Sequence, residues 1–166
     1  MNTLCMESGF VSLNKQGEDL CGDFFTTVSD DDATTFVLSD GMGSGVKANI
    51  LATLTAKILA TMTANHLSIR DSVTTLAQTL PVCSVRKLAY STFTLMQVLP
   101  DWQVYLAQFD NPQAILLRDG KSVEYPTQEL MVGDKRILES RLTLQSGDVF
   151  LLMTDGVTHA GLGNLI

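Results

Sequence analysis

The stretch TFVLSDGMGSG at residues 35–45 decides the fold, because an apolar run ends there in Asp40-Gly41 and a glycine-rich link follows. A second apolar run, DVFLLMTDGVTHA at residues 148–160, ends in Asp155-Gly156, 115 residues later. Asp-Gly is a frequent hairpin turn, but no strand-like run follows either of these two pairs. We therefore expect both carboxylates at the ends of strands, at the margin of a sheet.

Length and composition exclude several classes of protein. The 166 residues are 45% hydrophobic and 17% charged, which is typical of one folded domain. A net charge of −7 disfavours a nucleic-acid partner or an anionic membrane surface. The sequence has no secretory signal and no apolar run of the roughly 18–20 residues that span a membrane. We expect a cytoplasmic protein, or the cytosolic part of a larger one, whose three cysteines, Cys5, Cys21 and Cys83, are reduced and mostly buried.

Apolar periodicity predicts segregated strands and helices. Two strands are expected around the solvated acidic turn Asp30–Asp32, and six more after residue 89, with Asp119-Gly120 as a hairpin turn. The predicted strands are 23–29, 34–39, 90–99, 102–109, 113–118, 121–125, 136–144 and 149–154. Strands and helices that do not alternate favour an α+β fold, with two packed antiparallel sheets flanked by helices.

Two helices are expected between the second and third of these strands. The first begins after Gly45, and its predicted core face repeats every four residues: Val46, Ile50, Leu54, Ile58 and Met62, with Leu51 and Leu59 alongside. The second begins with the capping box Ser68-x-x-Asp71 and is stopped by Pro81. Its predicted core face is Ile69, Val73, Leu76, Ala77 and Leu80.

The chemistry of the Asp-Gly strand ends points to a hard divalent cation. Asp40 and Asp155 offer carboxylates, and a backbone carbonyl at a glycine is open to close approach. Oxygen donors of this kind suit Mg²⁺ or Mn²⁺. Asp23 begins the first strand and is expected beside Asp40, which ends the second. Zinc is disfavoured, because His66 and His159 are far apart and no Cys/His cluster exists.

A competing interpretation is nucleotide binding. A strand, the glycines of GMGSG at 41–45 and a helix follow one another as in a dinucleotide loop. However, the glycine spacing is GxGxG rather than GxGxxG, and residues 41–70 contain no Asp or Glu to bind a ribose. The glycines still leave a helix N-terminus open to a phosphate ester.

Four segments in order, GDFF (22–25), SDGMGSG (39–45), STFTLMQV (91–98) and LLMTDGV (151–157), resemble the PPM/PP2C superfamily of metal-dependent serine/threonine phosphatases. The similarity is greatest to its bacterial SpoIIE-like branch. It implies an α-β-β-α sandwich and two Mn²⁺ or Mg²⁺ ions per site. Asp40 would bridge the two metals, the Gly41 carbonyl would bind one of them, Asp155 the other, and Asp23 would join the first directly or through water.

The same resemblance implies a reaction and partners. Asp40 and Asp155 would be catalytic, and a metal-activated water would attack phosphoserine or phosphothreonine in a regulatory phosphoprotein, such as an anti-anti-sigma factor. Helices in 46–80 resemble the switch helices of this branch, which implies contacts with regulatory domains or a homodimer. The alternative is a catalytically inactive phosphatase-like module that binds or senses a partner.

Three departures from the family pattern are visible. Met42 stands where many members have His, and Lys15 is the nearest candidate for a basic phosphate-binding residue. The chain ends at GLGNLI, without the last metal-binding Asp of the family. The expectation is a single domain over 1–166, truncated at its C-terminus and lacking the last helix and strand.

Overall fold

The structure is a computed structural model that describes residues 5–14, 16–79 and 91–160. Its element order is α+β, as predicted, with two antiparallel sheets and a pair of long helices. The first half contains β1 (Asp23–Ser29), β2 (Thr34–Gly41), α1 (Gly45–Ala64) and α2 (Ile69–Thr79). The second half contains β3 (Ser91–Val98), β4 (Gln103–Phe109), β5 (Ile115–Arg118), β6 (Lys121–Val123), β7 (Gln128–Val132), β8 (Lys135–Thr143), β9 (Val149–Leu151) and α3 (Asp155–Thr158).

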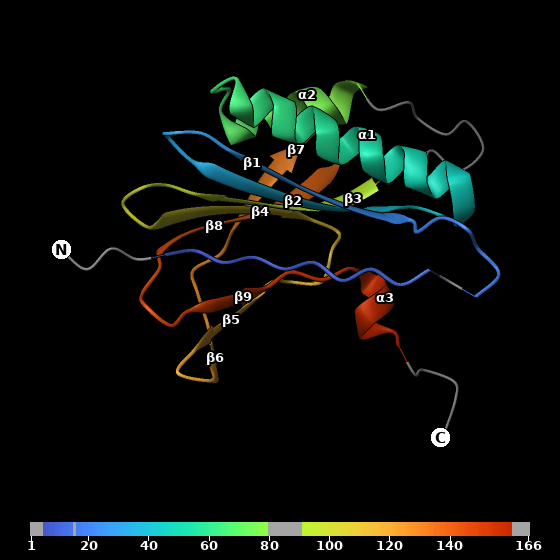
Figure 1. The fold of residues 1–166 in the computed structure, drawn as a ribbon. Coiled ribbons are helices and arrows are strands. Elements are labelled where there is room, and N and C mark those ends of the chain that lie inside the picture. Colours follow the sequence, from blue (N-terminus) through green and yellow to red (C-terminus); the bar gives the residue numbers. More distant parts are fainter. Residues whose placement is uncertain (1–4, 15, 80–90, 161–166) are drawn as a thin grey trace.

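Three layers make up the described part of the molecule. Figure 1 shows α1 and α2 above a six-stranded sheet, and β5, β6 and β9 below it. The large sheet has the order β1-β2-β3-β4-β8-β7 and the small sheet the order β6-β5-β9. No helix layer covers the outer face of the small sheet within the described residues. The two packed sheets of the predicted sandwich are therefore confirmed, together with one of its helical layers.

Alternation along the large sheet creates two cores. Phe24, Val37 and Phe93 point toward the helices and pack with Leu59, Val73 and Leu76. Their neighbours Phe25, Phe36 and Met96 point the other way and pack with Phe150 and Leu152 of the small-sheet side. Successive residues of a strand face opposite sides, so the parity of a residue in β1, β2 or β3 decides which core it joins.

The predicted core face of α1 is wrong over its first three turns. Val46, Ile50 and Leu54 are 61%, 52% and 48% exposed. The buried residues are Ala48, Ala52, Thr55, Ala56, Leu59, Ala60 and Thr63. All but Leu59 are small, and Leu59 is buried as predicted. Both sets recur with the same spacing of about four residues, so periodicity alone could not choose between them. The small set is buried because it lets the helix backbone lie close to the sheet.

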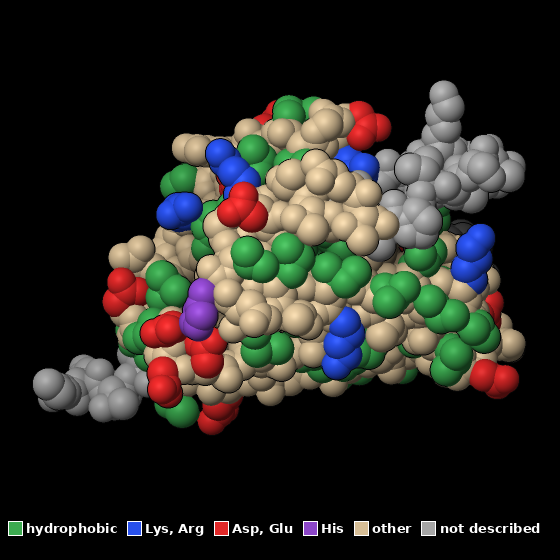
Figure 2. Space-filling view, turned by 90° about the horizontal axis from the view of Figure 1, so that it is seen from above, with side chains coloured by type: hydrophobic (Ala, Val, Ile, Leu, Met, Phe, Trp, Pro, Cys, Tyr) green, Lys and Arg blue, Asp and Glu red, His purple; other side chains and the backbone are tan. Residues whose placement is uncertain are grey.

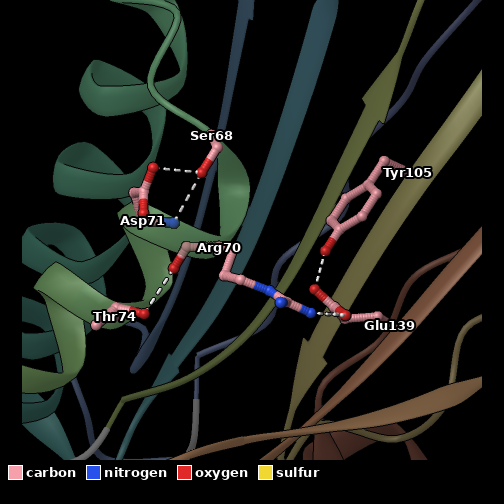
Figure 3. A network of polar contacts seen from close by, with 6 residues as sticks. All are labelled: Ser68, Arg70, Asp71, Thr74, Tyr105 and Glu139. Atoms are coloured by element: carbon pink, nitrogen blue, oxygen red, sulfur yellow. Dashed lines mark hydrogen bonds and ion pairs between the residues drawn. The ribbon is translucent and has the colours of Figure 1, made fainter.

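Helix α2 begins as predicted. The Ser68 hydroxyl accepts a hydrogen bond from the Asp71 N–H at 3.0 Å and donates one to the Asp71 carboxylate at 2.6 Å. Figure 3 shows this cap beside Arg70, which pairs with Glu139 of β8 at 3.4 Å, while Tyr105 of β4 donates to the same carboxylate. Ile69, Val73 and Leu76 are buried as expected. Leu80 and the predicted stop at Pro81 lie outside the described residues, and the side chain of Ala77 is not described.

Strand β7 is absent from the sequence prediction. It pairs with β8 across Gly133-Asp134, where Gly133 has a φ of +63°. The predicted Asp119-Gly120 turn is confirmed, because Arg118 pairs with Lys121 and both turn residues have positive φ. Strand β9 is shorter than predicted and ends at Leu151.

The acidic turn is as predicted, but the cysteines are only partly so. The Asp30–Asp32 turn is exposed, and its Asp30 carboxylate accepts the N–H groups of Asp32 and Ala33, each at 2.9 Å. Cys5 is exposed and Cys21 half-buried, so the prediction of mostly buried cysteines is wrong for Cys5. Cys83 lies outside the described residues. None of the described helices is long and apolar enough to cross a membrane.

Candidate metal centre

Asp23 and Asp40 lie directly opposite each other at one end of the large sheet. They are Cα partners in the antiparallel β1–β2 pair, so their side chains share a face. Asp23 is two residues before Phe25 and Asp40 four residues after Phe36, and both aromatic rings face the small sheet. The predicted neighbourhood of these two aspartates is confirmed, and their carboxylates point between the two sheets.

Asp155 approaches the pair from the opposite layer. It is the first residue of the short helix α3, which follows β9 of the small sheet and lies below the end of the large sheet where α1 begins (Figure 1). Asp155 lies close enough to Asp40 to raise the pKa of the Asp40 carboxyl. The buried Thr154 hydroxyl donates a 2.9 Å hydrogen bond to the Asp23 carboxylate. Three carboxylates that are distant in the sequence thus meet through Asp40.

The electrostatics of the site are those of crowded negative charge. Burial, together with the charges of Asp23 and Asp155, raises the pKa of Asp40 to about 7. Burial also raises the pKa of Asp23, and the hydrogen bond from Thr154 opposes that rise. No ion pair among the described residues joins Asp23, Asp40 or Asp155 to a lysine or arginine. Within the described part of the chain, no basic side chain pairs with this negative charge.

Gly41 holds its place for a steric reason. A Cβ at Gly41 would lie 1.8 Å from the backbone oxygen of Ala48 in α1, so only glycine admits the helix. The Gly41 N–H donates to the carbonyl of Gly22 at 2.9 Å. Ser39, two residues before Gly41, hydrogen bonds to Ser91 of β3, and the Ser91 hydroxyl donates to the Asp40 carbonyl at 2.9 Å. Helix α1 and β3 therefore both fix the backbone that presents Asp40.

The donor set fits a hard divalent cation. It consists of carboxylate oxygens at one end of the two sheets. A bound cation would offset the burial and the mutual repulsion that together raise the pKa of Asp40. Within 5–14, 16–79 and 91–160, no group of three or more His, Cys, Asp or Glu side chains is placed so that it could hold a metal ion by itself. The three aspartates instead interact in pairs: Asp23 and Asp155 each raise the pKa of Asp40, and Asp155 also acts on Asp23.

Sequence reasoning missed two threonines of this site. Thr154 precedes Asp155 and contacts Asp23, and Thr92 is the Cα partner of Asp40 on β3. The register of β2 and β3 could have revealed Thr92, because both strands were predicted and end in polar residues. Lys15, the candidate phosphate-binding residue, lies outside the described residues.

Most of the chain matches the model of a known protein family. The family model for Stage II sporulation protein E (SpoIIE) matches residues 30–165, which is most of the chain. The chain belongs to the SpoIIE family. The resemblance to the bacterial branch that the Asp-Gly motifs indicated is thereby confirmed, and the match includes Asp40 and Asp155. A comparison with curated protein sequences finds no significant match.

Solved structures show that this SpoIIE-family chain has the fold of PP2C phosphatase domains. The PP2C domain of SpoIIE from Bacillus subtilis, solved with a fragment of its regulatory domain, has a TM-score of 0.74 at 20% identity, over 89% of this chain and 44% of that chain. RsbX in complex with magnesium gives 0.66 at 22% identity, over 87% and 71%. The RsbU and RsbW domains of Rv1364c from Mycobacterium tuberculosis give 0.67 at 18% identity, over 86% and 42%. The chain thus spans less than half of the SpoIIE and Rv1364c chains.

Proposed function

We propose that this SpoIIE-family chain is a metal-dependent protein serine/threonine phosphatase whose single domain occupies residues 1–166. The observation that carries the proposal is the meeting of Asp23, Asp40 and Asp155, from β1, β2 and α3, without a compensating lysine or arginine among the described residues. A solved relative supports a metal requirement, since RsbX was solved in complex with magnesium.

The proposed roles follow the positions of the side chains. Asp40 lies between the other two aspartates and would bridge two Mn²⁺ or Mg²⁺ ions. Asp155 would hold one ion, and Asp23 with the Gly41 carbonyl the other. Thr154 keeps one Asp23 oxygen in place through its 2.9 Å hydrogen bond. Because the pKa of Asp40 is raised to about 7, this carboxyl would release its proton when a cation enters.

The chemistry would be direct hydrolysis of a phosphate ester. When bound, the cations would supply an activated water and stabilise charge on the phosphoryl oxygens. The carboxylates of Asp40 and Asp155 would hold and orient that centre at the edge of the two sheets. Met42 stands where many family members have a histidine that could protonate the leaving serine, so solvent would supply that proton. The proposed substrate is a regulatory phosphoprotein such as an anti-anti-sigma factor.

Calorimetry with Mn²⁺ tests the proposal, on the unsubstituted chain, on Asp40→Asn and on the control Asp31→Asn. Asp31 is an exposed carboxylate in the turn at the other end of the same β1–β2 hairpin. Binding by the chain and by Asp31→Asn, with loss in Asp40→Asn, is the expected result. Mn²⁺-dependent release of phosphate from a phosphoserine peptide, sensitive to the same substitution and to a chelator, would establish the activity.

The alternative function is an inactive phosphatase-like binding or sensing module. The absence of a finished three-residue metal site among the described residues favours it. Failure of Mn²⁺ to bind the unsubstituted chain would select this alternative over the phosphatase.

The exposed apolar stripe of α1 supports a partner on the helical face. Val46, Ile50 and Leu54 of α1, with Met42 just before the helix, are each about half exposed and four residues apart. Figure 2 shows hydrophobic side chains gathered across this face. We propose that a regulatory domain docks here, since SpoIIE was solved with part of one. The alternative is a homodimer through the same face. Light scattering measures the molar mass of the chain and of Ile50→Glu: a homodimer would dissociate on this substitution, whereas a chain that docks a regulatory domain would be a monomer in both forms.

A further inference from the structure

The polar side chains at the site continue past the aspartates onto β3. Thr92 is the Cα partner of Asp40, and it lies four residues before Met96, which faces the small sheet. Its side chain therefore shares the inter-sheet face with Asp23 and Asp40. Residues opposite each other in an antiparallel pair have Cβ atoms about 4.5–5.5 Å apart. Asp23, Asp40 and Thr92 form a polar row over three strands, with Asp40 in the middle.

Asn111 holds the outer end of this polar row. It belongs to the loop that carries the chain from β4 of the large sheet to β5 of the small sheet. Its side-chain oxygen accepts the Thr92 hydroxyl proton at 2.5 Å, and its amide donates to the Thr94 hydroxyl at 3.1 Å. Thr94 is fully buried, so Asn111 has a fixed anchor. The Thr92 proton is committed to Asn111, and the Thr92 oxygen keeps its lone pairs for the site.

The loop around Asn111 is itself secured at its far end. The Ala114 N–H donates to the side-chain oxygen of buried Gln108 at 2.6 Å, and Tyr125 donates to the Ala114 carbonyl at 2.5 Å. Asp110 at the start of the loop has a φ of +51°, an unusual conformation that neighbouring contacts must maintain. Asn111 is therefore held on a loop with defined contacts on both sides of it.

We propose that Thr92 orients water at the candidate metal centre and that Asn111 is a positioning residue that fixes the Thr92 hydroxyl. The inference rests on the proposed function. Mg²⁺ and Mn²⁺ keep several waters when few protein ligands bind them, and such waters donate hydrogen bonds and need acceptors. The Thr92 oxygen is a neutral acceptor beside Asp40. Outer partners of this kind orient the ligands and change metal affinity when removed.

The test measures Mn²⁺ affinity by calorimetry on the 166-residue chain and five variants, one of which is the Asp40→Asn variant of the proposed function. Thr92→Val and Asn111→Ala should each weaken affinity by about tenfold or more, whereas Thr92→Ser restores the hydroxyl and should bind as the unsubstituted chain does. Thr35→Val is the matched control, because buried Thr35 accepts a hydrogen bond from Gln97 at 3.3 Å at the far end of β2. Melting temperatures without metal, measured in parallel, report on folding separately.

Each outcome decides the matter. Unchanged affinity in both Thr92→Val and Asn111→Ala, while Asp40→Asn abolishes binding, would overturn this inference and leave the proposed phosphatase intact. An equal loss in Thr35→Val would also overturn it, since the effect would then be one of general stability. No binding by the unsubstituted chain would overturn the proposed function and this inference with it.

Discussion

The Thr154 hydroxyl donates a 2.9 Å hydrogen bond to the Asp23 carboxylate across 131 residues of sequence. It connects the segment after β9 of the small sheet with the first residue of β1 in the large sheet. The site therefore exists only where the two sheets meet, and its geometry depends on how they are held together.

Thr154→Val should destabilise the chain by about 1–2 kcal/mol, because it leaves a half-buried carboxylate without its donor. Urea unfolding at neutral pH without metal measures the change. Thr158→Val is the control, since its hydroxyl bonds only within α3, to the Asp155 carbonyl at 3.0 Å. Equal unfolding midpoints for both variants would show that the bond between the two sheets contributes nothing.

Gly41→Ala should destabilise the chain by about 1–3 kcal/mol or more, the usual cost of overpacking. The new methyl group would meet the backbone of Ala48 at 1.8 Å, and helix α1 would have to move away from the sheet. Thermal unfolding measures the effect. At Gly22 an added Cβ would make only ordinary contacts, at 3.5 Å or more, so Gly22→Ala should be tolerated. Comparable losses in both variants would contradict this account of Gly41.

Asp40 should make the stability of the metal-free chain depend on pH. Burial and the neighbouring aspartates raise its pKa from 3.8 to about 7, so between these values the folded chain binds a proton that the unfolded chain has released. Stability from this group is then highest at low pH and falls as pH rises through about 7.

Asp40→Asn removes this dependence. Without metal, the free energy of unfolding of Asp40→Asn should exceed that of the unsubstituted chain by about 1–2 kcal/mol at about pH 8, once the partial exposure of Asp40 is allowed for. At about pH 5 Asp40→Asn should have no such advantage. Urea unfolding with a chelator at both pH values measures this, with Asp31→Asn as control. A gap that is the same at both pH values would refute the raised pKa.

Substitutions on the two faces of α1 should differ sharply. Ile50→Ala on the exposed stripe should change the free energy of unfolding by less than about 0.5 kcal/mol. Ala52→Ile on the fully buried face should cost about 1–3 kcal/mol, because the helix lies close to the sheet there. Chemical denaturation of both variants measures these losses. A larger loss in Ile50→Ala than in Ala52→Ile would show that the core face predicted from the sequence is the buried one.

Much of the fold follows from local sequence. The β1–β2 hairpin, the Ser68 cap of α2 and the Asp119-Gly120 turn were predicted, because each depends on residues within a few positions of one another. Strand β7 was missed although Gly133-Asp134 marks its turn, since QELMV shows little alternation.

Which side of α1 is buried could not be predicted from the local sequence pattern. Large and small residues repeat along this helix with the same spacing, and the pattern of large apolar residues is the stronger signal in the sequence. The structure buries the small set because Gly41 lets the backbone at Ala48 come into contact with β2. Closeness of packing, rather than residue hydrophobicity, decided which side faces the core.

The sequence by itself determined which carboxylates end or begin strands, and therefore that Asp23 and Asp40 are neighbours, because antiparallel pairing fixes the positions of a hairpin's two ends. Only the tertiary structure decided that Asp155 reaches Asp40, that Thr154 holds Asp23, and that Thr92 and Asn111 extend the polar row. These contacts depend on the packing of one sheet on the other. That packing results from the summed burial of side chains over the whole chain, which no short stretch of sequence encodes.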